Sequence, residues 1–362
     1  MSKISGNKKY INLEGVRVSY RPKDDSIQIT STDEDLAGEN FQLVLKKNTD
    51  AEQALRNILV DKGLIKEELR EDKSSLLPTT AENPYLYGNV LPWNQIALGE
   101  KGENKPVIWD VSLEPHSLIT GSTGSGKSVL QRTIFNHCLV HRWEFYGIDM
   151  TKLELSPYLV YAETTKKVAT TILEGWLVLQ EISTILHERY SMMADIGVNH
   201  YLNLPGEEPW RPIMLMLDEA FVFLSLSGGK SNEARKDDAM VGLSSDLLGD
   251  ILRKGSAAGI HVTIATQRPD PAVIKGSMKA NIDVRIVAGR MDSTPSYMAL
   301  DSDAATKLPG GIKGRGIIRS SHELSEFQAY YTGQKFADEW VLLQQGAYEK
   351  ERYDYLISQL GK

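Results

Sequence analysis

The sequence predicts an α/β fold with a mainly parallel central sheet, preceded by a small α+β domain of βββα type. After about residue 90, short apolar runs alternate with long amphipathic segments, a pattern typical of parallel strands joined by helices. Before about residue 75, short runs alternate apolar and polar residues, as antiparallel strands do. The length of 362 residues also exceeds that of a usual single domain. We therefore expect two folded parts of unequal size.

The N-terminal part has the pattern of three short strands followed by one helix. Thr49 and Asp50 are typical helix-capping residues, and apolar residues then recur at helical spacing as far as Gly63. The charged stretch that follows, with Ser, Thr and Pro, is typical of a linker. The expected elements are strands at Val16–Tyr20, Ser26–Thr30 and Phe41–Leu45, the helix at Thr49–Gly63, a domain over residues 1–75 and a linker at 76–90.

The α/β part is expected over residues 91–334. Five apolar runs have the length and composition of buried parallel strands. Between the second and third, apolar residues recur every three or four positions from Val168 to Met193, which predicts a long helix with its stripe toward the core. A further helix is expected within residues 335–362. The predicted strands are Ser117–Thr120, Glu144–Asp149, Ile213–Leu217, His261–Thr266 and Asp283–Ala288.

The composition is that of an ordinary globular protein. Hydrophobic residues make up 41% of the chain, and 41 basic against 48 acidic side chains give a net charge of −7. This balance argues against a DNA-coating protein, although a basic stripe in a narrow channel needs no net positive charge. The single cysteine, Cys138, excludes a disulfide framework and suits a reducing cytoplasm. No apolar stretch approaches the roughly 18 residues that span a bilayer, so we expect a cytoplasmic chain without direct membrane insertion.

A glycine-rich phosphate-binding loop follows the first strand of the α/β part. Residues 121–128 read Gly-Ser-Thr-Gly-Ser-Gly-Lys-Ser, the full Walker A pattern. Glycines let the backbone wrap around phosphate oxygens, and the following helix directs its N–H groups at the same anion. In such loops the lysine reaches the β- and γ-phosphates of ATP, and the hydroxyl after it is a Mg²⁺ ligand. The residues expected to bind Mg-ATP are Gly121, Ser122, Thr123, Gly124, Ser125, Gly126, Lys127 and Ser128.

Polar side chains stand at the ends of two later strands. Ile213–Leu217 runs into Asp218 and Glu219, a pair that offers one carboxylate for Mg²⁺ and one to polarise the attacking water. We expect Asp218 to bind the metal and Glu219 to act as the base. The next strand runs into Gln267, whose amide could contact the γ-phosphate and couple hydrolysis to the segment after it. The structural alternatives are a solvated charge at Glu219 and a loop cap at Gln267.

These motifs stand in an order that resembles the motor domain of the FtsK/SpoIIIE family of hexameric double-stranded DNA translocases. The resemblance covers about residues 91–320, and its most specific piece is Ala257–His261 running into Ala265–Pro269. The other pieces are Leu98-Gly99 with Lys105–Val107, the Walker A loop, Ile148-Asp149 with Leu153–Tyr158, Glu188–Tyr190 with Ile196–Val198, Asp218-Glu219, and Lys279–Ile282 with Arg285-Ile286.

The resemblance implies a RecA-like fold and a homo-oligomeric ring, expected to be a hexamer, that hydrolyses Mg-ATP at subunit interfaces to pump double-stranded DNA. Family members often carry an arginine just before Ala-Ala-Gly-Ile-His, where a neighbouring subunit's ATP would feel its charge. Here that position is Ser256, and Arg253, one helical turn earlier, is the candidate for this trans-acting cation. A solvated helix-end charge is the alternative. For Asp149, functional and structural roles stay open.

A local excess of cations follows the strand that leads to Gln267. A ring motor would use such side chains to contact DNA phosphates without reading bases, which predicts sequence-tolerant, salt-sensitive binding. Dispersed surface charge is the alternative. Between Arg268 and Arg315 lie Lys275, Lys279, Arg285, Arg290, Lys307 and Lys313.

A double-stranded DNA translocase is the first functional hypothesis, and a related ATPase that moves protein in a secretion-type machine is the second. Such secretion motors usually carry several ATPase modules and membrane segments, whereas the sequence shows one module and no such segment. A non-motor nucleotide-binding protein is a third, disfavoured because both Walker elements are intact. Few residues follow the motor core, so we expect no winged-helix module, and analogy favours a phage, plasmid or integrative element. The N-terminal domain could dock a protein partner or form an oligomerisation collar.

Overall fold

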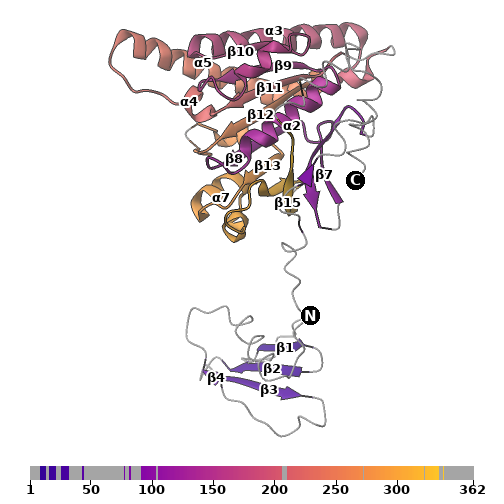
Figure 1. The fold of residues 1–362 in the computed structure, drawn as a ribbon, viewed down its shortest axis with the longest axis vertical. Coiled ribbons are helices and arrows are strands. Elements are labelled where there is room, and N and C mark those ends of the chain that lie inside the picture. Colours follow the sequence, from indigo (N-terminus) through magenta and orange to yellow (C-terminus); the bar gives the residue numbers. More distant parts are fainter. Residues whose placement is uncertain are drawn as a thin grey trace. The chain divides into compact units, whose positions relative to one another are not determined.

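The structure, a computed structural model, divides the chain into two compact units, Met1–Asp72 and Lys73–Lys362. In the larger unit, helices lie on both faces of a long sheet (Figure 1). The described residues are 9–13, 16–21, 26–31, 43–44, 77, 81–82, 91–102, 105–205, 210–271, 273–321, 323–333 and 337.

The smaller unit contains a four-stranded antiparallel sheet in the order β1-β2-β3-β4. The three predicted strands are present, the third of them shorter than expected, and β1 is an additional strand. The predicted helix at Thr49–Gly63 lies outside the described residues. The strands are β1 (Lys9–Leu13), β2 (Val16–Arg21), β3 (Ser26–Ser31) and β4 (Leu43–Val44).

The larger unit is built on one eleven-stranded sheet in the order β10-β9-β11-β12-β8-β13-β14-β15-β6-β7, with the short β5 paired to β15. From β10 to β13 all neighbours are parallel, and from β13 to β7 all are antiparallel. The strands are β5 (Ala81–Glu82), β6 (Gln95–Lys101), β7 (Lys105–Asp110), β8 (His116–Gly121), β9 (Glu144–Asp149), β10 (Thr165–Ala169), β11 (Ile213–Asp218), β12 (Ile260–Thr266), β13 (Val284–Ala288), β14 (Arg315–Ser320) and β15 (Glu323–Tyr331).

The two longest helices begin at side-chain caps. The Thr171 hydroxyl accepts a hydrogen bond from the Glu174 N–H at the start of α3, and the Ser231 hydroxyl accepts one from Ala234 N–H at the start of α5. Helix α3 ends at Gly197, whose φ of 80° suits glycine. The helices are α2 (Lys127–Val140), α3 (Ile172–Ile196), α4 (Ala220–Leu224), α5 (Asn232–Lys254), α6 (Gly276–Lys279) and α7 (Ser293–Leu300), with 3₁₀ turns at Ser156–Val160, Tyr201–Asn203, Gly255–Ala258 and Ala304–Lys307.

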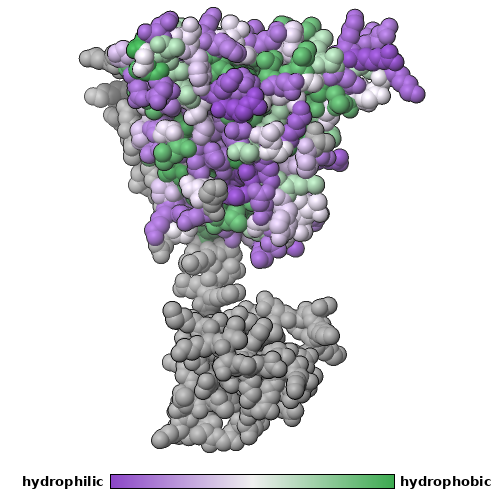
Figure 2. All heavy atoms as spheres, turned by 180° about the vertical axis from the view of Figure 1, so that it is seen from behind, coloured by the Kyte–Doolittle hydropathy of each residue, from purple (hydrophilic) through white to green (hydrophobic). Residues whose placement is uncertain are grey.

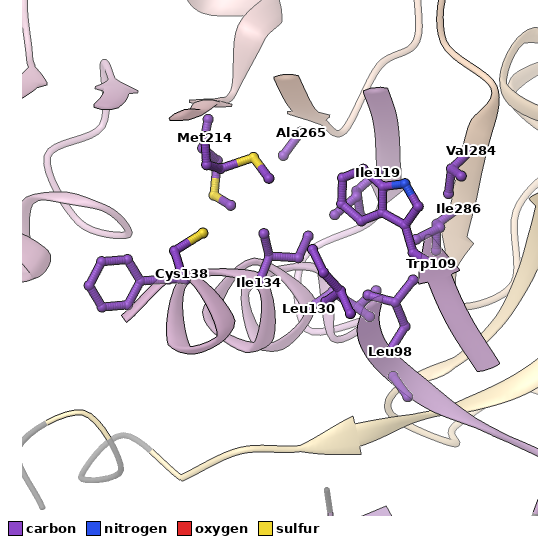
Figure 3. Close-up of a cluster of buried hydrophobic side chains, with 14 of the residues drawn as sticks. Leu98, Trp109, Ile119, Leu130, Ile134, Cys138, Met214, Ala265, Val284 and Ile286 are labelled. Carbon is purple, nitrogen blue, oxygen red and sulfur yellow. The ribbon is translucent and has the colours of Figure 1, made fainter. Parts of the chain in front are cut away.

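The core consists of one apolar layer on each face of the sheet. Strand β11 contributes to both, because successive side chains of a strand point to opposite faces. Met214 and Met216 pack with Leu130 and Ile134 of α2 (Figure 3). The alternate residues Ile213, Leu215 and Leu217 pack under α3 and α5. Burial on both faces explains why β11 reads as an uninterrupted apolar run.

All five predicted strands of the α/β part are present, as β8, β9, β11, β12 and β13. Val168, expected at the start of the long helix, instead lies in β10, because that helix begins four residues later at Ile172. The antiparallel strands β6, β7, β14 and β15 were not predicted. Apart from residue 337, the helix expected within residues 335–362 lies outside the described residues.

The surface of the larger unit mixes polar and apolar residues (Figure 2). The N-terminal end of α5 projects from the body and is strongly hydrophilic. Within the part of the chain that the structure describes, no helix is both long enough and apolar enough to cross a bilayer.

Candidate nucleotide site

The glycine-rich loop joins the end of β8 to the start of α2, as predicted. Geometry explains why glycine stands at positions 121 and 126 of this loop. A side chain at Gly121 would collide with the Ser125 hydroxyl and lie 2.8 Å from the Ala288 carbonyl oxygen. Gly126 has a φ of 110°, a backbone conformation that residues other than glycine rarely adopt. No side chain caps α2, so the N–H groups of Lys127 and Ser128 at its start can bind an anion.

Asp218, at the end of β11, faces the loop. Its Oδ1 accepts hydrogen bonds from Lys127 Nζ at 3.1 Å and Gln131 Nε2 at 3.0 Å. Burial raises the pKa of Asp218, and the neighbouring Lys127 ammonium only partly opposes this effect. A second cation near this carboxylate would therefore stabilise its ionised form.

Glu219 lies closer to the same ammonium than Asp218 does. Its Oε1 is 2.5 Å from Lys127 Nζ and accepts a hydrogen bond from Gln267 Nε2 at 2.9 Å. Burial would raise the pKa of Glu219, but the hydrogen bonds from Lys127 and Gln267 outweigh it and hold the pKa below its ordinary value. Glu219 also has a φ of 45°, an uncommon conformation for a residue with a side chain. The structure thus brings Lys127, Asp218, Glu219 and Gln267 together.

The cavity around these residues has a volume of about 650 Å³, within the range of small-molecule sites. The P-loop and the C-terminal end of β15 both contribute to its walls. Sequence reasoning did not assign several of its lining residues to this site, among them Leu153, Lys313 and Tyr331. Lys313 was interpreted as a DNA-contacting cation, whereas the structure places it in the wall of this cavity. No sequence signal connected Tyr331 with the loop, because β15 itself was not predicted.

Ser128 and Asp218 line the same cavity and offer hard oxygen atoms. Such donors suit Mg²⁺, which usually takes one or two protein oxygens and completes its shell with water and phosphate oxygens. The residues present therefore fit the ion. Among the described residues, there is no group of three or more His, Cys, Asp or Glu side chains that could hold a metal ion.

Asp149 has a structural role in this subunit. Its carboxylate is buried and accepts hydrogen bonds from the backbone N–H groups of Lys152, Glu154, Leu155 and Ser156 and from the Thr151 hydroxyl, at 2.7 to 3.3 Å. These bonds shape the loop after β9. Although burial acts to raise the pKa of Asp149, the bonds lower it overall.

Arg253 does not reach the nucleotide cavity of its own subunit. It lies at the end of α5, just before β12 begins, whereas the P-loop follows the opposite ends of the parallel strands. Its guanidinium pairs with Asp250 at 3.0 Å and is largely exposed. At this position Arg253 is remote from the nucleotide cavity of its own chain.

Two of the predicted DNA-contacting cations are held in an ion-pair cluster. Lys279 Nζ and Arg285 Nη1 lie 2.5 and 2.6 Å from the carboxylate of Asp301, which also binds Arg319. Burial acts to raise the pKa of Asp301, but these hydrogen bonds together have a larger effect and hold the pKa well below its usual value. Arg315, which bounds the predicted stretch, is buried against Glu326 and Gln328 and is not a surface cation.

Residues 90–216 match the model of the FtsK/SpoIIIE family. This part of the chain is therefore similar to that family. The DNA translocase FtsK of Oceanobacillus iheyensis is 32% identical over 229 residues, 59% of this chain and 28% of that protein. FtsK of Lactiplantibacillus plantarum is 29% identical over 275 residues, 67% of this chain and 33% of that protein. The chain thus spans about a third of the length of these relatives.

Solved structures show the same fold over more of the chain. The pCW3 conjugation coupling protein TcpA, solved with ATPγS, has a TM-score of 0.66 and 21% identity, covering 95% of this chain and 93% of its own. The cytoplasmic domain of the type VII secretion ATPase EccC from Thermomonospora curvata has a TM-score of 0.55 and 19% identity, and the match covers 80% of this chain and 34% of that one. The larger unit therefore has the RecA-like P-loop ATPase fold expected from the family resemblance.

Proposed function

We propose that this chain is an ATP-driven double-stranded DNA translocase that hydrolyses Mg-ATP at the subunit interfaces of a ring, expected to be a hexamer. The observation that carries the proposal is the convergence of Lys127, Asp218 and Glu219 at the end of the P-loop. Hydrolysis needs a carboxylate for the metal beside a base, whereas a protein that only binds nucleotide needs no base. The FtsK relatives are named DNA translocases, which supports duplex DNA as the substrate.

The contacts of Glu219 suggest how the site begins its cycle. The structure pairs the Lys127 ammonium with Glu219 and Asp218. Phosphate oxygens of ATP would attract Lys127, and Glu219 would then be free to orient water. Bound Mg²⁺, held by Ser128 and Asp218, would supply charge neutralisation at the phosphates. Gln267 would then lose its hydrogen bond to Glu219, and this loss would couple nucleotide binding to the conformation of the segment after β12.

Substitution of the proposed base gives the first test. Glu219→Gln should retain ATP binding while reducing turnover by about 10²–10⁴-fold, because an amide cannot accept the proton. Glu163→Gln, at an exposed position before β10, is the matched control and should hydrolyse ATP normally. Turnover that survives Glu219→Gln would show that another group is the base.

Stimulation by DNA gives the second test. ATP turnover should rise when long duplex DNA is added, without dependence on its sequence, and the stimulation should fall as salt increases. Displacement of a third strand from the duplex would report movement. A protein-moving ATPase would show neither response, and the fold alone does not separate the two, because EccC shares it. TcpA is described as a conjugation coupling protein, which favours plasmid or integrative-element DNA as the biological substrate.

A further inference from the structure

The nucleotide cavity has two large, exposed apolar side chains on walls that lie outside the Walker motifs. Leu153, in the turn after β9, is 74% exposed, and Tyr331, at the end of β15, is 57% exposed. Both line the cavity that contains Lys127 and Asp218. Within the described part of the chain, neither side chain is buried in the apolar core. They would suit a ligand that is charged at one end and flat and apolar at the other.

Tyr331 is held firmly although its own ring is exposed. By strand alternation it shares a face with Phe327 and Ala329, which pack against the α2 side of the core, whereas Tyr330 packs with Ala97 on the other side. Its neighbours Tyr330 and Thr332 are only 2% and 3% exposed.

Two contacts fix the backbone at this point. The Thr332 carbonyl accepts a hydrogen bond from Arg132 Nη1 of α2 at 3.2 Å, which ties the end of β15 to the helix that begins in the P-loop. Strand β5 pairs in parallel with Tyr330 and Tyr331. The aromatic ring is therefore carried by a preorganised strand end, which lowers the entropy cost of binding.

Leu153 is held in a similar way. The Asp149 carboxylate binds the backbone N–H groups of Lys152 and Glu154 on either side of it, at 2.9 and 3.1 Å. Leu155, two residues later, is fully buried. Asp149 thus fixes a turn whose exposed apolar side chain faces the cavity, and this accounts for a buried carboxylate that the proposed hydrolysis does not use.

We propose that Leu153 and Tyr331 bind the nucleobase between them, with Asp149 as the positioning residue for the Leu153 turn. The proposal rests on the proposed function, because it takes the nucleotide triphosphate as the ligand. The P-loop binds the phosphates, and the two apolar walls supply faces for the purine. We call Leu153 and Tyr331 together the base clamp. Stacking uses the ring face that every base has, so the clamp contributes affinity and orientation rather than a choice among bases.

The test separates the two ends of the ligand. Binding of the non-hydrolysable analogue AMP-PNP and of inorganic tripolyphosphate, each with Mg²⁺, is measured by calorimetry on the full chain. Tyr331→Ala should weaken AMP-PNP binding about tenfold, in line with the effect of losing one aromatic stacking partner, while tripolyphosphate binding stays within about twofold. Leu153→Ala should act in the same direction with a smaller effect, and Tyr331→Phe should restore binding.

Matched controls are available on the same unit. Tyr297→Ala on α7 and Leu113→Ala remove side chains that are 54% and 78% exposed but do not line the cavity, and neither should affect either ligand. The triphosphate of 2-aminopurine riboside adds a spectroscopic readout, because its fluorescence should be quenched by Tyr331 in the native chain and less so in Tyr331→Ala.

The outcomes are distinct. Equal loss of both ligands in Tyr331→Ala would mean that the residue only shapes the site, and unchanged AMP-PNP binding would mean that the base lies elsewhere. Either result overturns the clamp and leaves the proposed ATPase standing. A native chain that binds neither ligand overturns the proposed function and the clamp with it.

Discussion

Three buried histidines should make the larger unit sensitive to mild acid. His116 and His261 lie at the starts of β8 and β12, and His137 lies in the last turn of α2. Each imidazole forms a hydrogen bond with the backbone, His116 with Val262 N–H, His137 with Trp93 C=O and His261 with Pro115 C=O. Burial lowers the pKa of His116 and His137 to about 3 and that of His261 to about 4, and a neighbouring histidine adds to the effect in each case.

The sign and size of the effect follow from proton linkage. These side chains stay neutral in the folded state, but in the unfolded chain they bind protons below the ordinary histidine pKa of 6.5. Stability is therefore lost as pH falls from about 6.5 toward about 4, by about 1.4 kcal/mol per pH unit for each histidine. At about pH 5 the three together remove about 6 kcal/mol relative to neutral pH. Asp218, whose pKa is raised, offsets at most one proton of the three.

Urea unfolding followed by tryptophan fluorescence, at constant ionic strength between about pH 7 and about pH 5, measures this slope. His137→Gln should reduce the slope by about one third, whatever it does to stability at neutral pH. His187→Gln, which removes an exposed histidine of α3, should leave it unchanged. An uptake of less than one proton on unfolding in this window would refute the assignment of the three histidines as neutral and buried.

Three further predictions concern charged side chains. Lys313→Ala should raise the KM for ATP about five- to tenfold with little change in kcat in steady-state turnover, because this basic residue lines the nucleotide cavity. Lys307→Ala, an exposed control, should leave the KM unchanged, and an unchanged KM in Lys313→Ala would exclude the contact. Arg253→Ala and Lys127→Ala chains should each be inactive alone but regain part of the ATPase activity when mixed, whereas full activity of Arg253→Ala alone would exclude a role in trans. Asp301→Asn should destabilise the folded chain by about 1 kcal/mol, measured as a lower melting temperature, since the Asp301 side chain is half exposed. Added salt should restore part of the lost stability, because it screens the repulsion among the remaining cations. A melting temperature of the variant that does not change with salt would contradict this explanation.

The parallel half of the sheet and its helices could be predicted from sequence. Strands buried on both faces read as apolar runs, and the long helix α3 carries its own cap and glycine stop. The antiparallel half could not. Strands β14 and β15 mix polar and apolar residues, and their identity depends on pairing with β13 and β6, which lie far away in the sequence.

Predicting the cations from sequence was less successful, because charge density says nothing about partners. Arg285 and Lys279 share the carboxylate of Asp301, a residue in a different local segment. Arg315 reads as a surface cation but is buried, since Glu326 and Gln328 on the neighbouring strand compensate its charge and its hydrogen-bond donors. Lys313 lies in the nucleotide cavity because the turn before β14 is hydrogen-bonded to the P-loop, from Gly314 N–H to the Ser125 carbonyl.

The sequence by itself determined the P-loop, the Asp218–Glu219 pair and the order in which these motifs follow the strands along the chain. Each of these is a local pattern, formed by residues that are neighbours in the sequence. Only the tertiary structure decided which side chains meet Lys127, that Asp149 shapes a turn, and that Leu153 and Tyr331 line one cavity. Those contacts join segments far apart in the chain, and the folding of the sheet brings them together through hydrogen bonds and burial that no short stretch of sequence contains.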